Sequence, residues 1–595
     1  MTTCKHNPNR HEKDPTQSTL HMGGDGVVVC KFDPEVLREA FAEMVIEDEQ
    51  PFSMAERSGM RKFMAKDCPR FTLPSRRTCT RGAVRKYFEQ KAKLKQFFRQ
   101  HGDGVCLTTD CWTSKKQDGY MTVTAHFIDN EWQQHKKLIA FFKVKGHKGE
   151  DIGKNLQRVM NEWGMQKVIT VIVGNASNND TALNYLRKQM VNANTSIASG
   201  KYLHMRCAAH IVNLIVSDGL KEVDLSVQRV RAAVRYIKNG TNRMDKFHEV
   251  GEDEKIDSDA FMNLDVCTRW NSTYLILKAA LVYEKLFVRF AEDDANYVLD
   301  LSANGGVGHP DELDWHKVQK IAEFLKRFYD LTVRVSSSLH VTANSFFVEI
   351  GEVHILVKKW LESKDDLQKE MGKRMKDKYN KYWGMWHENN RLLEKEKGKE
   401  KEKENINLLI FVSAAIDPRY KLTEYLELAI EEIFGNENGP KVWVAVTTCF
   451  HDMFDEYMNL YAPPSDDATL ENSGTQQNED AASVGGGMMK ELIAKRMKLN
   501  NGGNSRISIH KSELDKYLAE DCEDPYKKLD VLAWWKLNAT RFPILACLAR
   551  DVLSIPISTV ASESAFSIGG RVLDDFRTSL TPFMVEALVC TQDWL

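Results

Sequence analysis

The chain has 595 residues, of which 42% are hydrophobic and 28% charged, and its formal net charge at pH 7 is −2. This composition is typical of a soluble globular protein with about two to four domains. It excludes a chain that spans a bilayer, because no apolar run approaches about 18–20 residues, and the first residues lack the apolar stretch of a signal peptide. The 12 cysteines are too dispersed for a disulfide framework, which favours a reducing compartment.

Residues 1–30 are polar, with few apolar side chains, and we expect them to be disordered. Side chains that bind zinc in other proteins do occur in this segment: Cys4, His6, His11, His21 and Cys30. Their spacing matches no common zinc module, so zinc is not expected.

Residues 31–103 are predicted to form a helical, basic, DNA-binding region, with Ser75 as the N-cap of one helix. From Arg57 to Arg99, fourteen lysines and arginines stand against two acidic residues, a net charge of +12. This density indicates binding to a polyanion, although a solvated helix face is the alternative. The candidate DNA contacts are Arg76, Arg77, Arg81, Arg85 and Lys86.

The pattern changes to strands after residue 103. Apolar and β-branched runs predict strands at 105–109, 120–128, 138–144 and 168–173, with a helix at 151–163 before the last of them. This order is typical of the opening of a mixed α/β sheet, and we assign residues 104–185 to it.

Two of these strands run into polar residues, and only one of them ends at an acid. Asp110 follows the first strand, whereas Gly174 follows the strand at 168–173. Two carboxylates at the ends of neighbouring strands can hold divalent metal for phosphoryl chemistry. From these residues alone, a helix cap or turn acid is the favoured interpretation of Asp110.

Residues 186–462 are predicted to be mostly helical, apart from a charged, solvated linker at Glu394–Glu404. Residues 463–511 contain an acidic, flexible linker. Order returns in residues 512–595, with helices at 529–537 and 544–553. A last helix, capped by Ser558 or Thr559 and ended by Gly569-Gly570, carries Glu563.

Six separated motifs occur in one order along the chain: Leu107-Thr-Thr-Asp-Cys-Trp-Thr-Ser114, Asn175-Ala-Ser-Asn-Asn-Asp180, Arg206-Cys-Ala-Ala-His210, Thr268-Arg-Trp-Asn-Ser-Thr273, Asp417-Pro-Arg-Tyr-Lys421 and the tail Leu529–Leu595. Together they resemble the hAT transposase superfamily, most closely its plant RICESLEEPER/DAYSLEEPER type. The resemblance implies an RNase H-like core, interrupted by a large helical insertion and completed by a C-terminal dimerisation region. The expected fold class is therefore α/β plus all-α.

The resemblance also implies a catalytic triad of two aspartates and a glutamate that bind two metal ions. Asp110 matches the first acid and Glu563 the third, whereas Gly174 occupies the position of the second. Without that acid, binding of two ions should be poor. Asp180, six residues further along, is a possible substitute that would require a shifted metal.

Other family positions carry over individually, each with a structural alternative. His210, in Cys207-x-x-His210, matches a motif near the DNA path or is a satisfied buried histidine. Arg269 and Trp270 match a pair that supports a flipped base, or Trp270 is a core residue. The resemblance assigns four residues to dimerisation, with packing inside one subunit as the alternative: Trp534, Trp535, Phe542 and Leu545.

The resemblance further implies a BED zinc finger at the N-terminus, yet residues 4–10 resemble the stretch that follows this finger. We therefore expect most of the finger to be missing, and sequence specificity on DNA to be weak.

Three hypotheses follow. The first is a dimeric, nuclear, DNA-binding protein without transposase activity, and with neither cofactor nor membrane contact. The second is an active transposase that uses Mg²⁺ or Mn²⁺. The third is an interaction module that dimerises with related hAT proteins.

Overall fold

The structure is a computed structural model of the chain. It describes residues 19–23, 26–30, 32–114, 116–146, 148–193, 195–221, 225–254, 270–336, 340–387, 392–396, 399–403, 405–461, 513–573 and 580–595. Within these ranges, no helix is both long enough and apolar enough to cross a bilayer.

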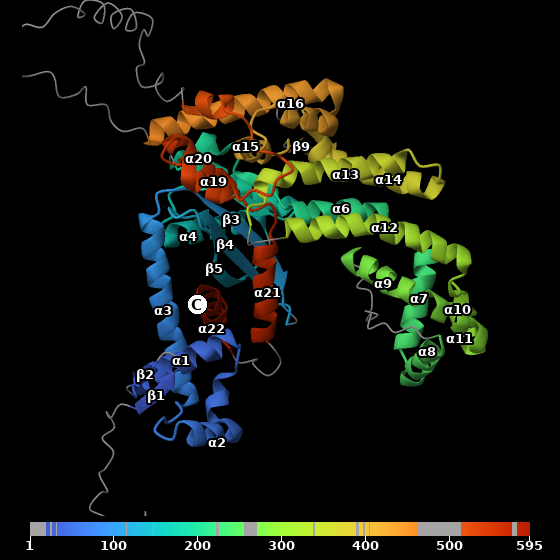
Figure 1. Cartoon of the computed structure of the whole chain (residues 1–595), viewed down its shortest axis with the longest axis horizontal. Coiled ribbons are helices and arrows are strands. Elements are labelled where there is room, and N and C mark those ends of the chain that lie inside the picture. The colour runs from blue at the N-terminus through green and yellow to red at the C-terminus, as the bar shows by residue number, and fades with distance from the viewer. Residues whose placement is uncertain are drawn as a thin grey trace, which may run out of the picture.

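A five-stranded mixed sheet lies at the centre of the fold (Figure 1). Its strands are β3 (Val105–Thr113), β4 (Gly119–Ile128), β5 (Gln134–Val144), β6 (Val168–Val173) and β7 (His204–Arg206). Their spatial order is β5-β4-β3-β6-β7; β3, β4 and β5 pair antiparallel, and β6 pairs parallel with both β3 and β7. The predicted mixed sheet is confirmed, and β3 and β6 are neighbours as expected.

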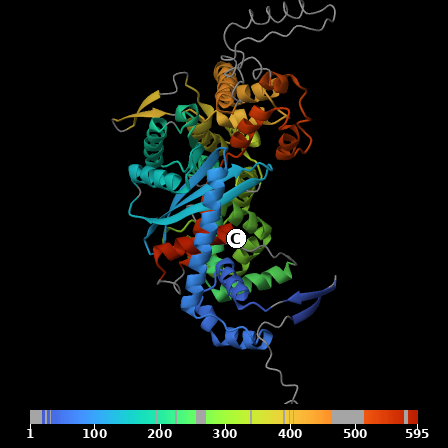
Figure 2. The ribbon, with the colours of Figure 1, turned by 90° about the vertical axis from the view of Figure 1, so that its left-hand side faces the viewer.

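Helices α3 (Arg76–Gln100), α4 (Gly149–Trp163) and α5 (Ser177–Asn192) lie beside the sheet. Helices α1 (Pro34–Glu47) and α2 (Ser58–Asp67) lie near the N-terminal end of α3, away from the sheet (Figure 1). Ser75 caps α3 as predicted, because its hydroxyl accepts a hydrogen bond from the Thr78 amide at 3.3 Å. Helix α3 crosses one face of the sheet (Figure 2), where Phe97 lies 5.1 Å from Phe127 of β4 between ring centroids.

The middle of the chain is helical, as its amphipathic pattern predicts. The helices are α6 (Ala208–Gly219), α7 (Leu225–Lys238), α8 (Thr241–Asp253), α9 (Trp270–Val282), α10 (Glu284–Asp293), α11 (Ala295–Ser302), α12 (Glu312–Val335), α13 (Phe346–Leu361), α14 (Asp366–Tyr379), α15 (Leu409–Ile416) and α16 (Glu424–Tyr461). Helices α7–α11 form a lobe away from the sheet (Figure 1).

The C-terminal segment returns to the sheet. It contains α19 (Val531–Asn538), α20 (Pro543–Leu553), α21 (Val560–Val572) and α22 (Pro582–Trp594). Ser562 of α21 lies 2.9 Å from the Thr108 hydroxyl and 3.2 Å from the Thr124 hydroxyl, so buried hydroxyl contacts attach this helix to β3 and β4. Helix α22 lies between α3 and α21.

The sheet separates two hydrophobic cores, because successive residues of a strand point to opposite faces. Val105 and Leu107 of β3 pack into a core shared with α3, α4, α5 and α22. Cys106, between them, packs into a second core with α6, α15, α16 and α20. Both faces of β3 are therefore buried, which explains its continuous apolar run.

Strand β3 is longer than its apolar pattern predicts. Its pairing with β4 continues to Thr113, with Asp110 opposite Thr122. Asp110 therefore lies inside a strand, and the expectation that it terminates one is wrong. Backbone pairing with β4 extends β3 through polar residues, which the hydrophobic pattern alone cannot reveal.

The sheet also extends past the expected boundary at residue 185. Strand β7 pairs with β6, with His204 opposite Val171. Three residues carry too little alternation to be recognised as a strand.

Two segments expected to lack structure form antiparallel hairpins. Strands β1 (Thr19–Gly23) and β2 (Gly26–Cys30) pair within the segment predicted to be disordered. The run of β-branched residues Val27–Val29 explains this correction. Strands β8 (Leu392–Glu396) and β9 (Lys399–Lys403) pair within the predicted charged linker. The predicted linker at 463–511 lies outside the described residues.

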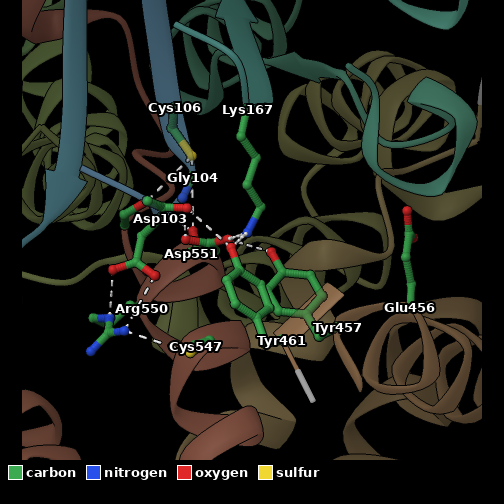
Figure 3. A network of polar contacts seen from close by, with 12 residues as sticks. Asp103, Gly104, Cys106, Lys167, Glu456, Tyr457, Tyr461, Cys547, Arg550 and Asp551 are labelled. Atoms are coloured by element: carbon green, nitrogen blue, oxygen red, sulfur yellow. Dashed lines mark hydrogen bonds and ion pairs between the residues drawn. The ribbon is translucent and has the colours of Figure 1, made fainter. Parts of the chain in front are cut away.

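A fully buried carboxylate connects the sheet to the helices beneath it (Figure 3). Asp551 of α20 accepts a hydrogen bond from the Gly104 amide at 2.6 Å and lies 2.5 Å from the Lys167 ammonium. Tyr457 of α16 donates its hydroxyl to the same carboxylate, and Lys167 donates to Tyr461 at 2.7 Å. Four separate parts of the chain therefore meet at one charge.

The ion pair offsets the cost of burying its charges. Burial alone would lower the pKa of Lys167, but the Asp551 carboxylate and the Tyr461 hydroxyl together outweigh this and the pKa is raised. The close approach requires glycine at 104, because a Cβ there would lie 2.9 Å from the Asp551 carboxyl carbon and 2.4 Å from Ile169.

We predict that Asp551→Asn lowers the free energy of unfolding by about 3–5 kcal/mol, because Lys167 would keep a buried charge without its partner. Asp293→Asn, which disrupts an exposed pair with Arg289, should cost less than about 1 kcal/mol. Urea unfolding followed by circular dichroism measures both, and equal losses would contradict the prediction.

Candidate functional site

Three side chains with metal-binding or acid–base chemistry meet at one edge of the sheet. Asp110 comes from β3, His210 from the first turn of α6, and Glu563 from the first turn of α21. One ligand atom of each lies within 4.8 Å of the others. They line a cleft of about 590 Å³, together with Trp112 and Trp270.

Local hydrogen bonds hold two of these side chains. Asp110 accepts from the Cys111 amide at 2.8 Å. Glu563 accepts from the Thr559 hydroxyl, one helical turn earlier, at 3.1 Å. That hydroxyl also lies 3.5 Å from His210 Nδ1, so Thr559 lies between two members of the cluster.

Helices α6 and α21 are attached to each other directly beside the cluster. The Ala208 amide donates to the Ile557 carbonyl at 2.8 Å, and the Thr559 amide donates to Cys207 Sγ at 3.3 Å. Cys207 is fully buried. The two residues of the Cys-x-x-His motif therefore have different roles. Cys207 holds the start of α21, and His210 lines the cleft.

The three groups affect one another's protonation. Burial raises the pKa of Asp110, and Glu563 adds to this, whereas His210 and the Cys111 amide lower it. The Cys207 side chain, followed by the carboxylates of Asp110 and Glu563, raises the pKa of His210 to about 9 against the effect of burial. At neutral pH, a protonated imidazole therefore accompanies the two acids, and its Nδ1 lies 3.8 Å from Glu563.

Gly174 faces the same cluster. It follows β6, and a Cβ built on it would lie 3.6 Å from His210 Nε2, which is an ordinary van der Waals distance. The backbone φ of Gly174 lies outside the left-handed region, so the conformation does not require glycine. A longer side chain at position 174 would therefore reach the ring of His210.

Asp180, the possible substitute, lies on α5 and is engaged elsewhere. Its carboxylate lies 3.0 Å from the Arg206 guanidinium. Among the described residues, the group that joins Asp110 and Glu563 within ligand-sharing distance is His210 and not Asp180. The described geometry therefore gives no support to a rescue by Asp180.

Family models match four separate parts of the chain. The ZBED1 RNase-like domain matches residues 108–202, the ZBED1 RNase-like helical domain 205–324, the hAT-like transposase RNase-H fold 344–457, and the hAT family C-terminal dimerisation region 513–595. Asp110 and Glu563 thus fall in the first and last matched parts.

Similar proteins match over nearly the whole chain. A protein of Oryza sativa subsp. japonica named zinc finger BED domain-containing protein RICESLEEPER 2 is 30% identical over 96% of this chain and 76% of its own length. The chain belongs to the hAT transposase-like family. A Zea mays protein that carries the AC transposase name is 29% identical over 95% of this chain and 66% of its own length. The Arabidopsis thaliana protein DAYSLEEPER is 27% identical, with 95% and 74% covered.

The other positions predicted in this hAT chain have different surroundings. Trp270 begins α9, is 5% exposed and lines the cleft. It is therefore both a core residue and a residue of the cleft wall. Arg269 lies outside the described residues, as do Cys4, His6 and His11.

The basic region is only partly free of acidic partners. Lys86 is ion-paired with Glu43, and Arg85 lies 3.4 Å from Glu39. Lys91 and Lys95 both approach Glu162 of α4. The local count of +12 therefore overstates the charge of this surface, because other elements bring acids to it.

Exposed cations nevertheless remain on α3. Arg76, Arg77 and Arg81 of its first turns are exposed. Within the described part of the chain, no acidic side chain lies within ion-pairing distance of Arg77 or Arg81.

The residues assigned to dimerisation lie mostly inside one subunit. Trp535 and Leu545 are fully buried and Phe542 is 1% exposed. The Trp535 indole donates to the Ile416 carbonyl at 3.1 Å, and Trp534, half-buried, donates to Glu523 at 3.1 Å. Three of the four thus fill the core of this subunit; a part in a dimer interface stays a prediction.

Sequence reasoning missed Thr559 and Trp112 as parts of the site. Thr559 precedes Glu563 by four residues, the spacing that places two side chains on one helical face. Trp112 follows Asp110 by two residues, so both point to one face of β3. These two spacings could have placed Thr559 and Trp112 beside the acids from the sequence alone.

We predict that Gly174→Ala leaves the stability unchanged or raises it by about 0.4–1 kcal/mol, because the Cβ fits and the unfolded chain loses freedom. Gly153→Ala is the matched control: its Cβ would lie 2.8 Å from the Ala182 carbonyl oxygen, so we expect a loss of about 1–3 kcal/mol. Thermal unfolding measures both. If Gly174→Ala were as damaging as Gly153→Ala, glycine would be required by the fold.

Proposed function

We propose that this chain is a nuclear, self-associating DNA-binding protein of the hAT family without two-metal strand cleavage. The observation that carries the proposal is Gly174. It occupies the position that the family resemblance assigns to the second catalytic acid, it faces the cluster, and the fold gives no reason for glycine there. Two carboxylates, one of them half-buried and raised in pKa, are a poor ligand set for two divalent ions.

The exposed cations of residues 57–99 support DNA binding. Arginine and lysine bind phosphates without reading sequence, and phosphate neutralisation makes affinity fall steeply with salt. The exposed members of this surface are Arg57, Arg61, Lys62, Lys66, Arg70, Arg76, Arg77, Arg81, Arg85, Lys93 and Arg99. The names of the relatives refer to a BED zinc finger, which is in keeping with nuclear DNA binding.

We predict that Arg77→Gln with Arg81→Gln weakens binding to a mixed-sequence duplex and reduces the slope of log K against log salt by about 1.8, or 0.9 for each phosphate contact. Arg85→Gln with Lys86→Gln removes equal charge from side chains already paired with acids, so the slope should change less. Fluorescence anisotropy between 50 and 200 mM salt (about a fourfold range) measures both. Tight binding that ignores salt would overturn the proposal.

The active-transposase alternative is favoured by one observation: Asp110 and Glu563 do meet, in an open cleft. Strand cleavage in Mg²⁺ or Mn²⁺ that Asp110→Ala abolishes would establish this alternative. Cleavage that appears only in the Gly174→Asp variant would support the proposed function.

Self-association rests on the matched dimerisation region. Most of its apolar side chains are buried, but Tyr526 is 92% exposed and Leu537 80%. Exposed apolar side chains are the ones available to a partner. We propose that these two, rather than Trp535, contact another chain, either a second copy or a related hAT protein as in the interaction-module hypothesis.

We predict that Tyr526→Glu with Leu537→Glu shifts the chain toward monomer, because it places charges in an apolar contact. Leu313→Glu is the control, since Leu313 is 73% exposed but lies on α12, outside the matched region. Light scattering after size exclusion gives the mass. A parent chain that is monomeric at all concentrations would contradict self-association.

A further inference from the structure

The cluster in the cleft differs chemically from a site for two magnesium ions. Mg²⁺ prefers oxygen ligands in an octahedron and keeps several waters. Here two carboxylates are accompanied by an imidazole, and position 174 supplies no side chain. The residues present therefore do not fit two Mg²⁺ ions.

The same three groups fit a single ion of a different class. Co²⁺ and Zn²⁺ accept an imidazole ligand more readily than Mg²⁺ does, and carboxylates complete such sites. Three protein ligands that leave an open position are typical of sites that also bind a water or a substrate oxygen. The cleft supplies the space for that oxygen.

The geometry is close to what one ion requires. Ligands of one ion at about 2.0–2.2 Å lie about 3–4 Å from one another, compared with the upper limit of 4.8 Å here. The Glu563 side chain is 43% exposed, so it can move by the remaining distance of about 1 Å. The amide oxygen of Asn271, in the same cleft, is buried without a hydrogen-bond partner among the described residues.

Neighbouring groups already orient the ligands. Thr559 contacts both Glu563 and His210, and the Cys111 amide fixes Asp110. Hydrogen bonds to the ligands are a regular property of metal sites in proteins.

We propose that Asp110, His210 and Glu563 bind one transition-metal ion, with a preference for Co²⁺ or Zn²⁺ over Mg²⁺, and that the ion displaces the proton from the His210 imidazole. The expectation of a chain without metal rested on the missing acid at position 174; the position of His210 supplies a different third ligand. This inference does not depend on DNA binding, because the ion is held by the chain's own residues.

Cobalt is the probe, because its visible absorption reports the ligands directly. The full chain carries Cys4→Ser, His6→Ala and His11→Ala, which remove alternative ligands outside the described residues, and is freed of metal with a chelator. Titration by absorption and calorimetry should give one Co²⁺ per chain, bound at least tenfold more tightly than Mg²⁺. Absence of Co²⁺ binding, or equal affinity for Mg²⁺, would overturn the proposal.

Variants identify the ligands. His210→Ala should weaken Co²⁺ binding at least tenfold and change the absorption bands, whereas His316→Ala, on the exposed side of α12, should change neither. Gly174→Asp should raise Mg²⁺ affinity at least tenfold by adding an oxygen ligand. If His210→Ala is shown by circular dichroism to be unfolded, Glu563→Gln replaces it, since that side chain is exposed. Unchanged Co²⁺ affinity in the folded ligand variant would refute the site.

Discussion

The charge of Asp551 is the constraint on which the arrangement of this molecule depends. A carboxylate without solvent exposure is tolerated only when it is paired, and its partners come from the starts of β3 and β6 and from α16. Because α20 precedes α21 by a short connection, the same contacts determine where Glu563 enters the cleft. The position of the site therefore depends on an ion pair at the opposite end of the strands.

The parts of the fold that local pattern encodes could be predicted. The strand at Val168–Val173 has the expected bounds, since an unbroken apolar run is a strong signal. Ser75 caps α3, as its position directly before the helix predicts. The meeting of Asp110 with Glu563 came from the resemblance, because no local pattern links residues so far apart in the chain.

The remainder depended on contacts between distant segments. The acids that neutralise Lys86 and Lys91 come from α1 and α4, and the burial of Trp535 depends on how α19 packs against α15 and α20. Neither is visible in the composition of the segment itself. His210 was identified as a motif residue, but its place between two carboxylates needed the turn from β7 into α6, and β7 is too short to be recognised.

The 447 residues that separate Gly104 from Asp551 have a consequence for synthesis. At about 5–20 residues per second, the ribosome needs about 20–90 s to add that length. During this interval the sheet strands have left the ribosome, while the carboxylate that neutralises Lys167 does not yet exist. The nascent chain must therefore hold the five strands without the C-terminal helices that cover them, with an unpaired cation at one end and exposed apolar faces. Rapid docking of α20–α22 once they have been made, or protection by chaperones before then, decides how much protein reaches its folded form.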